Sequence, residues 1–400
     1  MLLGRCLLVA ACLSIATNHV AIAADPLDNL PAAISGGKPN LDFRLRYENV
    51  GQDNALKDAD AYTARLRLGY TTAKWNDVDA MAEYEGIVYL GDEQYNSGLN
   101  GKTDFSTVSD PKGNELNQAW IRYTGLPDTS LKFGRSALMY DNARFVGYGL
   151  WRQNEQTFDG LFFTNTWVPK TTVNYAYVTN DNSTSSVSFR LHAHLINVAY
   201  AVAPWLNVVA YDYLLNFEQN TAAKQDTQSF GARASGAIAA GPGKLNYAAE
   251  YARQLPYKDA PDTAKASYYL AEVGYGLPLV NGKVGYEVLG SNGGHYGFQT
   301  PLATKHGFQG WAEQFLTVPD TGVRDLYAGV GGAVIRINWL AMYHRFKADD
   351  GGAHYGNEVD LMSTYPITSA LNIGAEFADY IADAFSVHTR KTWAWVEYKF

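Results

Sequence analysis

Four arginines occur in two pairs, Arg44 with Arg46 and Arg65 with Arg67, and the members of each pair are two residues apart. Side chains at this spacing point to the same face of an extended strand. If the two segments lie side by side, the four guanidinium groups form a positive stripe that can bind or orient an anionic group. The same charges could instead pair with carboxylates on neighbouring strands and only hold the wall. The sequence leaves both interpretations open.

Carboxylates occur on the same alternating faces as these arginines, so both signs of charge are expected on one surface. The cations assigned to it are Arg44, Arg46, Arg65, Arg67 and Arg190. The anions are Asp42, Glu48, Glu83, Glu85, Glu250, Glu287, Glu358, Asp360 and Glu376.

Two further arginines, Arg144 and Arg152, flank the glycine-rich segment Phe145–Trp151. Such a segment could fold back between strands and narrow a passage, which would put both arginines at the narrow point. A solvated external loop is the alternative.

Residues for catalysis or metal binding are few. His192 and His194 share one face of a predicted strand but lack a clear third ligand. Ser136 follows Gly134-Arg135 without the second glycine of a nucleophile elbow. We therefore expect no catalytic residue, no metal site, no cofactor and no enzymatic activity.

The elements that would position these side chains are strands, because apolar and polar residues alternate along most of the chain. In 41–48 every second residue is apolar and the others are charged, and a second such segment covers 62–70. We expect eighteen strands, near Leu41–Glu48, Tyr62–Tyr70, Val78–Tyr89, Glu115–Tyr123, Ser130–Ala137, Gln156–Thr166, Thr172–Val178, Ser186–Tyr200, Leu206–Phe217, Gln228–Ala237, Leu245–Arg253, Ser267–Tyr275, Lys283–Leu289, Val323–Val330, Ala333–Phe346, Glu358–Tyr365, Leu371–Tyr380 and Lys391–Phe400.

The connections alternate in length, as they do when a chain winds up and down through a membrane. The longest polar loops cover 90–114 and 290–322. Short turns are expected at Ala73–Asp77, Gly125–Asp128, Trp167–Lys170, Val202–Trp205, Ala239–Gly243, Gly276–Gly282, Gly331–Gly332 and Pro366–Ser369. This parity predicts an all-β, transmembrane antiparallel β-barrel with up-and-down topology.

The two ends of the chain support export to an outer membrane. Residues 1–23 have a basic start, an apolar run and a small-residue cleavage pattern, which predict a signal peptide. The next segment, 24–40, is expected to be periplasmic and short, and 41–400 to form the barrel. The last strand ends on the aromatic Phe400. Both cysteines, Cys6 and Cys12, lie in the predicted signal peptide, so the mature chain would have no thiol chemistry.

The charge and aromatic content narrow the possible partners. The chain carries 32 basic and 40 acidic residues, which gives nucleic-acid binding no support. Its 28 Tyr, 9 Trp and 17 Phe are typical of the aromatic girdles of membrane barrels. Outer-membrane lipid and small hydrophilic or anionic solutes are the expected partners, and the oligomeric state stays open.

Several longer motifs resemble those of the alginate-export family of proteobacterial outer-membrane porins. The motifs that carry the resemblance are Asn114–Ala119, Gly134-Arg135, Arg144–Gly147, Trp151–Asp159, Phe298–Thr304, Gly310–Ala312, Tyr380–Asp383 and Lys391–Trp393. The resemblance implies a barrel in which Arg135, Arg144 and Arg152 match family arginines near the constriction. The sequence departs from the family pattern at Ser136, where many relatives have Gln, and at His344-Arg345-Phe346, where His-Asp-Phe is common.

These observations predict an outer-membrane porin that forms a water-filled channel for passive diffusion of small hydrophilic or anionic solutes. One alternative is an exporter of an anionic polysaccharide such as alginate, which would need a continuous basic path. Another is a barrel plugged by its own loops, with an enzymatic or structural role. The many carboxylates of the predicted inner face argue against a polyanion, because it would meet repulsion at several levels.

Overall fold

The computed structural model describes residues 29–218 and 225–400, and the predicted signal peptide, 1–23, lies outside them. A short helix, α1 (Leu30–Ser35), begins with a proline in its first turn, where the missing N–H costs nothing. Its Ala33 carbonyl accepts a bond from Ala73 N at 2.9 Å in the connection between the second and third strands. No helix in these residues is long and apolar enough to cross a membrane.

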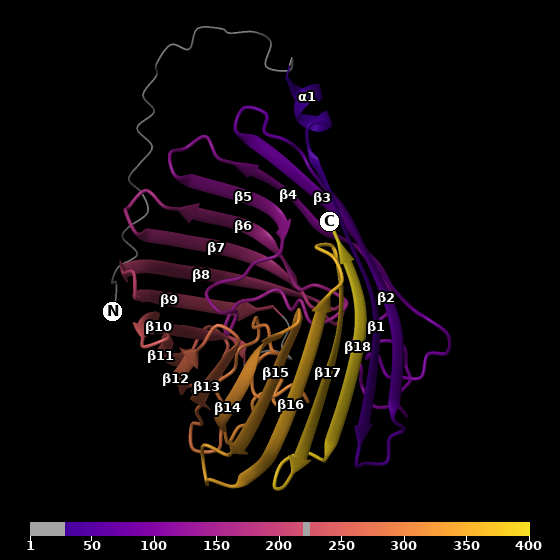
Figure 1. The fold of residues 1–400 in the computed structure, drawn as a ribbon. Helices are drawn as coiled ribbons and strands as arrows, with labels where there is room; N and C mark the ends of the chain where they lie inside the picture. Colours follow the sequence, from indigo (N-terminus) through magenta and orange to yellow (C-terminus); the bar gives the residue numbers. More distant parts are fainter. Residues whose placement is uncertain (1–28, 219–224) are drawn as a thin grey trace.

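The described residues form one eighteen-stranded antiparallel sheet, which confirms the predicted all-β, up-and-down barrel (Figure 1). Consecutive strands pair with each other throughout. The strands are β1 (Lys38–Gln52), β2 (Ala59–Thr71), β3 (Val78–Tyr89), β4 (Gly113–Tyr123), β5 (Thr129–Ser136), β6 (Thr157–Asn165), β7 (Thr171–Asn182), β8 (Ser188–Ala203), β9 (Leu206–Phe217), β10 (Thr227–Ala240), β11 (Gly243–Pro256), β12 (Ala266–Gly276), β13 (Val280–Leu289), β14 (Val323–Val334), β15 (Ile337–Lys347), β16 (His354–Pro366), β17 (Leu371–Ala382) and β18 (Thr389–Lys399).

The barrel closes between β1 and β18, whose register places Leu45 opposite Val396. Just beyond this ladder, Leu41 and Phe400 exchange two backbone hydrogen bonds of 3.1 and 3.0 Å. Closure leaves no unpaired strand edge in lipid, where an unsatisfied peptide group is costly. The terminal aromatic residue therefore takes part in the seam of the barrel.

One predicted turn is wrong. The turn expected at Gly331-Gly332 lies four residues later, at Ile335 and Arg336, whose φ angles are 47° and 66°. The two glycines belong to β14 and permit close strand contact, since a Cβ on Gly332 would lie 2.2 Å from the Leu279 carbonyl oxygen. Glycine composition alone cannot separate this use from a turn.

The left-handed backbone at Ile335 is unfavourable for a β-branched side chain. Because the residue is 87% exposed, Ile335→Asn removes little packing and is expected to stabilise the barrel by about 1 kcal/mol. The urea midpoint of unfolding measures the effect. Ile367→Asn is the matched control, because Ile367 is exposed in another periplasmic turn without a positive φ. An equal gain in both variants would mean that replacing an exposed apolar side chain by an amide causes the gain, and not relief of the backbone at Ile335.

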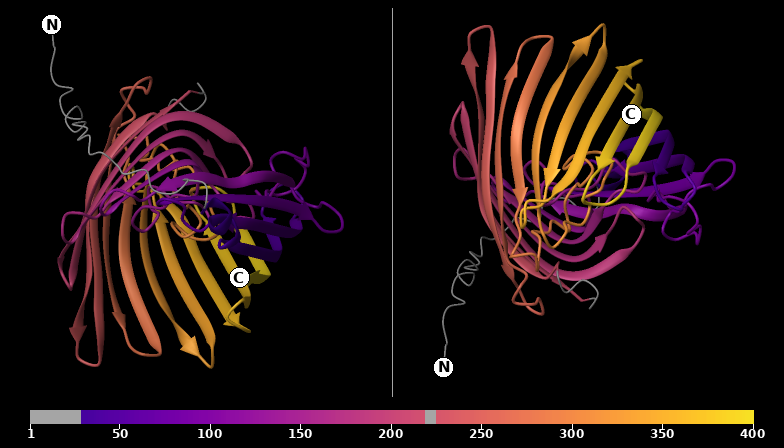
Figure 2. Two further views of the ribbon diagram at one scale, coloured as in Figure 1. Left: turned by 90° about the horizontal axis from the view of Figure 1, so that it is seen from above. Right: turned by 90° about the horizontal axis from the view of Figure 1, so that it is seen from below.

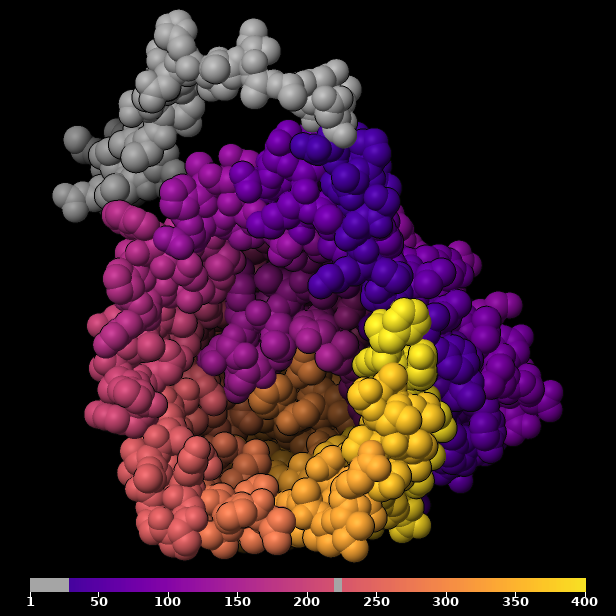
Figure 3. Space-filling model, turned by 45° about the horizontal axis from the view of Figure 1, so that its top comes forward, coloured from indigo at the N-terminus to yellow at the C-terminus, as the bar shows by residue number. Residues whose placement is uncertain are grey.

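Two long loops fold inside the ring of strands (Figure 2). They are the 137–156 loop, between β5 and β6, and the 290–322 loop, between β13 and β14. Figure 3 looks into the barrel from the end that carries α1, and magenta and orange segments cross the hollow. Short turns lie at this end, which makes it the periplasmic one. The lumen is therefore narrowed by loops and not only by the wall.

Candidate functional site: the loop-narrowed lumen

The four arginines of the predicted stripe lie on the inner wall. The register of β1 and β2 places Arg44 opposite Arg65, and Arg46 and Arg67 also lie buried on this face. Like charges directly opposite each other repel. Their stability therefore depends on the counter-charges that surround them.

Arg65 and Arg67 are neutralised by carboxylates. Arg65 contacts Asp42 at 2.6 Å and Glu397 at 3.1 Å. Arg67 pairs with Glu85 and, at 3.5 Å, with Glu155 of the 137–156 loop. Glu83, the other carboxylate predicted on β3, accepts a hydrogen bond of 2.8 Å from the Asn117 amide. This half of the stripe belongs to a wall of paired charges.

Arg44 and Arg46 also hold the backbone of the 137–156 loop, although Arg46 in addition pairs with Glu48 at 2.5 Å. Arg44 donates to Gln153 Oε1 at 2.9 Å and to the carbonyl oxygens of Leu150, Trp151 and Arg152 at 3.3, 3.1 and 2.5 Å. Arg46 bonds the Trp151 carbonyl as well, and its guanidinium lies 4.4 Å from the centroid of the Trp151 ring. Hydrogen bonds from a charged donor are stronger than neutral ones. These two arginines thus anchor the loop to the wall.

Arg152 joins the two inward loops. It contacts Glu48 of β1 at 3.0 Å and also Glu313 of the 290–322 loop, which receives Lys391 Nζ at 2.7 Å. Burial alone would raise the pKa of Glu313, but Arg152, Lys391 and His306 together hold it well below its usual range. The His306 ring stacks on Trp151 with centroids 4.0 Å apart. Charge pairing and stacking therefore act at the same junction.

Arg144 makes a second junction, at a different point of the wall. Its Nε lies 2.6 Å from Glu287 Oε1 of β13, and its other nitrogens donate to Thr300 and Gln309 at 3.1 Å each. Burial would lower the pKa of Arg144, but Glu287 outweighs it and the pKa is raised. Backbone bonds between Gly147 and Leu302 (2.9 Å) and between Thr304 and Ala143 (3.1 Å) tie the loops together nearby.

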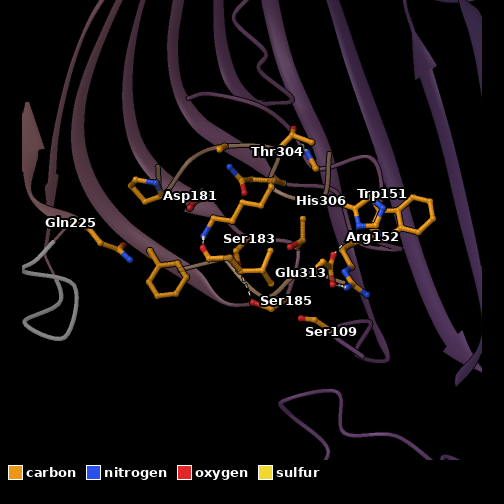
Figure 4. Close-up of a pocket in the computed structure, with 18 of the residues that line it drawn as sticks. Ser109, Trp151, Arg152, Asp181, Ser183, Ser185, Gln225, Thr304, His306 and Glu313 are labelled. Atoms are coloured by element: carbon orange, nitrogen blue, oxygen red, sulfur yellow. Dashed lines mark hydrogen bonds and ion pairs between the residues drawn. The ribbon is translucent and has the colours of Figure 1, made fainter. Parts of the chain in front are cut away.

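Two cavities lie on either side of this assembly. The first, of about 320 Å³, is lined by segments that include the external loops after β7 and β9 (Figure 4). The second, of about 440 Å³, is lined by inner-wall residues that include Arg233 and Glu272. The cavities share no lining residue, and the neighbours His306 and Gly307 line one each. The 290–322 loop therefore separates an external cavity from one that lies deeper in the barrel.

The external cavity carries groups of both signs. Figure 4 shows Arg152, Glu313 and His306 together on one side, across from Asp181. Lys305, which also lines it, donates to the Leu316 carbonyl at 2.8 Å. Burial lowers the pKa of Lys305, and Asp181 opposes this shift only in part. A solute in this cavity would meet fixed donors and acceptors within a few ångströms of each other.

Two predicted lumen residues lie elsewhere. Arg190 is exposed on the outer face of β8, because Leu191 and Leu195 face inward and belong to the apolar cluster that includes Val146 of the 137–156 loop. The rule that polar residues face the lumen fails where an apolar loop segment covers the wall. Arg135 pairs with Asp159 at 2.7 Å. Two residues earlier on the same strand, Phe133 lies opposite Leu161, and both of these side chains are exposed on the outside of the barrel. The structure does not bring Arg135 together with Arg144 and Arg152.

The histidines and the serine that could serve in metal binding or catalysis contact other groups of the protein. Tyr177 and Tyr175 contact the Nδ1 atoms of His192 and His194 at 2.9 Å each. Ser136 is buried, and its hydroxyl donates to the Ala137 carbonyl at 3.1 Å. In the described parts of the chain no group of three His, Cys, Asp or Glu residues is placed to hold a metal ion.

Comparison with known families gives a match for residues 39–288, to a family described as alginate export. No curated protein matches the chain. Solved outer-membrane channels have similar folds. OpdK of Pseudomonas aeruginosa, in its structure with vanillate, has a TM-score of 0.72 and 13% identity, covering 92% of this chain and 99% of OpdK. OccAB4 of Acinetobacter baumannii has a TM-score of 0.71 and 14% identity, covering 91% of this chain and 98% of OccAB4. At these identities the likeness establishes the fold.

Proposed function

The chain belongs to the alginate export family. From this membership and the barrel fold we propose that it is an outer-membrane porin for small hydrophilic solutes. Solutes pass down their own gradient, through a lumen that the 137–156 and 290–322 loops narrow. The observation that carries the proposal is the pair of cavities of about 320 and 440 Å³ on either side of those loops. Cavities of this size accommodate small organic molecules.

The charges of the lumen support only a weak preference for anions. Arg46, Arg65 and Arg67 pair with carboxylates, and Arg44 and Arg46 also donate to carbonyl oxygens of the 137–156 loop. A paired charge produces a small net field. The vanillate of the OpdK structure is a small carboxylate and has the size that we propose for solutes of this channel.

Export of an acidic polysaccharide is the second candidate, and family membership is the observation that favours it. A linear polyanion needs a continuous basic path that a chain can thread. Here the junction at Arg152 and Glu313 and that at Arg144 and Glu287 cross the lumen instead. Export would require both loops to leave the positions that these ion pairs hold.

An enzymatic role has little support, and we propose that the chain has none. A serine nucleophile needs a base that accepts its proton. The neighbour of Ser136 is Lys132, whose Nζ lies 3.1 Å from the hydroxyl oxygen and acts as a donor, while the hydroxyl itself donates to a backbone carbonyl. The buried position of Ser136 also denies a substrate access.

Single-channel recording in planar bilayers tests the proposal. We expect discrete steps of low conductance, because the loops narrow the passage, and an anion-to-cation permeability ratio only slightly above unity, because most lumen charges are paired. A strongly anion-selective channel that alginate oligomers block would favour the exporter. A folded barrel without steps would contradict a porin and support loops that close the lumen.

A further inference from the structure

A shallow depression of about 220 Å³ lies on the outside of the barrel, away from the lumen. Its lining residues come from three consecutive strands, Tyr286 from β13, Arg324 and Leu326 from β14, and Arg345 and Lys347 from β15. Three of the five side chains are cationic. Such a cluster is unusual on a lipid-facing wall, where charges are costly near the membrane centre.

The strand register forces these cations together. Arg324 lies directly opposite Lys347, and Leu326 lies opposite Arg345. Like charges on facing positions of an antiparallel pair repel, and an anion nearby relieves the repulsion.

The protein itself supplies one such anion. Asp349 accepts a bond of 2.7 Å from Arg324 Nε. Among the described residues the structure shows no ion-pair or hydrogen-bond partner for the side chains of Arg345 and Lys347. The depression therefore keeps an excess of positive charge.

The position of the depression indicates the kind of ligand. Lys347 is the last residue of β15 and Arg324 the second of β14, so the cations lie at the external end of the wall. Toward the middle of the membrane the same face continues with exposed apolar side chains, among them Tyr343 and Val284. A ligand that fits this surface has an anionic head and an apolar body.

We propose that this depression binds the phosphate group of an outer-leaflet glycolipid, whose acyl chains lie along the apolar wall below it. The external leaflet of a bacterial outer membrane is the place where a phosphorylated glycolipid meets that end of a barrel. Arg345 and Lys347 bind the phosphate, and Arg324 adds its charge while it stays paired with Asp349.

The test measures binding of diphosphorylated lipid A to the purified full-length protein by native mass spectrometry in detergent. The double variant Arg345→Gln with Lys347→Gln should weaken binding at least tenfold. The matched control is Arg390→Gln, because Arg390 is an exposed cation at the external end of β18 that already lies 3.5 Å from Asp379. It should leave binding unchanged. The shift in gel mobility on heating shows that each variant is folded.

Two further probes identify the source of the phosphate. Lipid A without phosphates should bind the unmodified protein as weakly as the diphosphorylated form binds the double variant. Inorganic phosphate at millimolar concentration should not displace the lipid. Displacement by inorganic phosphate would overturn the lipid proposal in favour of a free-anion site, and unchanged lipid binding in the double variant would exclude the depression as the site.

Discussion

Replacing both Arg44 and Arg46 with glutamine is expected to raise the single-channel conductance severalfold. The two side chains hold three consecutive carbonyls of the 137–156 loop and the face of Trp151. Each bond from a charged donor contributes about 1.5–3 kcal/mol. Without them the loop loses much of its attachment to β1, where the ion pair of Arg152 with Glu48 remains, and the lumen widens for a larger share of the time.

Arg65→Gln is the matched control for this change. Arg65 belongs to the same ladder and is equally buried, but its two ion pairs join it to Asp42 and Glu397 of the wall. Its replacement should shift the permeability ratio slightly toward cations without a rise in conductance. If the double variant instead lost anion preference at unchanged conductance, Arg44 and Arg46 would act as selectivity groups, which is the other interpretation of the stripe.

The barrel was predictable because its signal is local. Alternation along segments such as 41–48 needs only the side chains and the period of a strand, and all eighteen strands are confirmed. The turn at Ile335 and Arg336 was missed because neither residue type favours a positive φ. Gly331 and Gly332, which do, serve close contact between strands instead.

The site was predictable only in part, because loops have no period. Both signs of charge on the inner wall follow from alternation, but Glu313 and His306 lie in the 290–322 loop and no pattern places them beside Arg152. Arg190 shows the same limit of the alternation pattern, because the pattern assigns it to the lumen and the structure places it on the outer face. Its strand reverses the usual polarity because a loop covers the inner face, and the position of that loop depends on contacts far apart in the sequence.

In this chain the inward loops, and not only the wall, determine how wide the passage is. The wall alone would enclose a wide pore. The loop residues that contact the wall determine the width and the charge of the passage that remains. In this chain two ion-pair junctions hold the loops, at Arg152 with Glu48 and at Arg144 with Glu287. Because Arg144 and Glu287 form a single ion pair, whereas Arg152 also pairs with Glu313, the second junction can be tested by changing one pair of charges.

Removal of either partner of the Arg144 and Glu287 pair is expected to destabilise the folded protein by about 3–5 kcal/mol, because the remaining charge is buried without its counter-ion. The ion pair measures 2.6 Å, and both side chains are almost fully buried. Arg144→Gln and Glu287→Gln should each lower the urea midpoint of unfolding. The single-channel current should also become noisier as the 137–156 loop moves.

The double variant, Arg144→Gln with Glu287→Gln, should cost less than the sum of the two single variants, because two neutral amides need no counter-ion. Glu287 also accepts bonds from Tyr268 and Gln309, so some loss persists when it is replaced. Strict additivity would mean that the two charges do not depend on each other. The loop would then be held by its backbone bonds between Gly147 and Leu302 and between Ala143 and Thr304. In that case the noise of the single-channel current should not rise in any of the three variants.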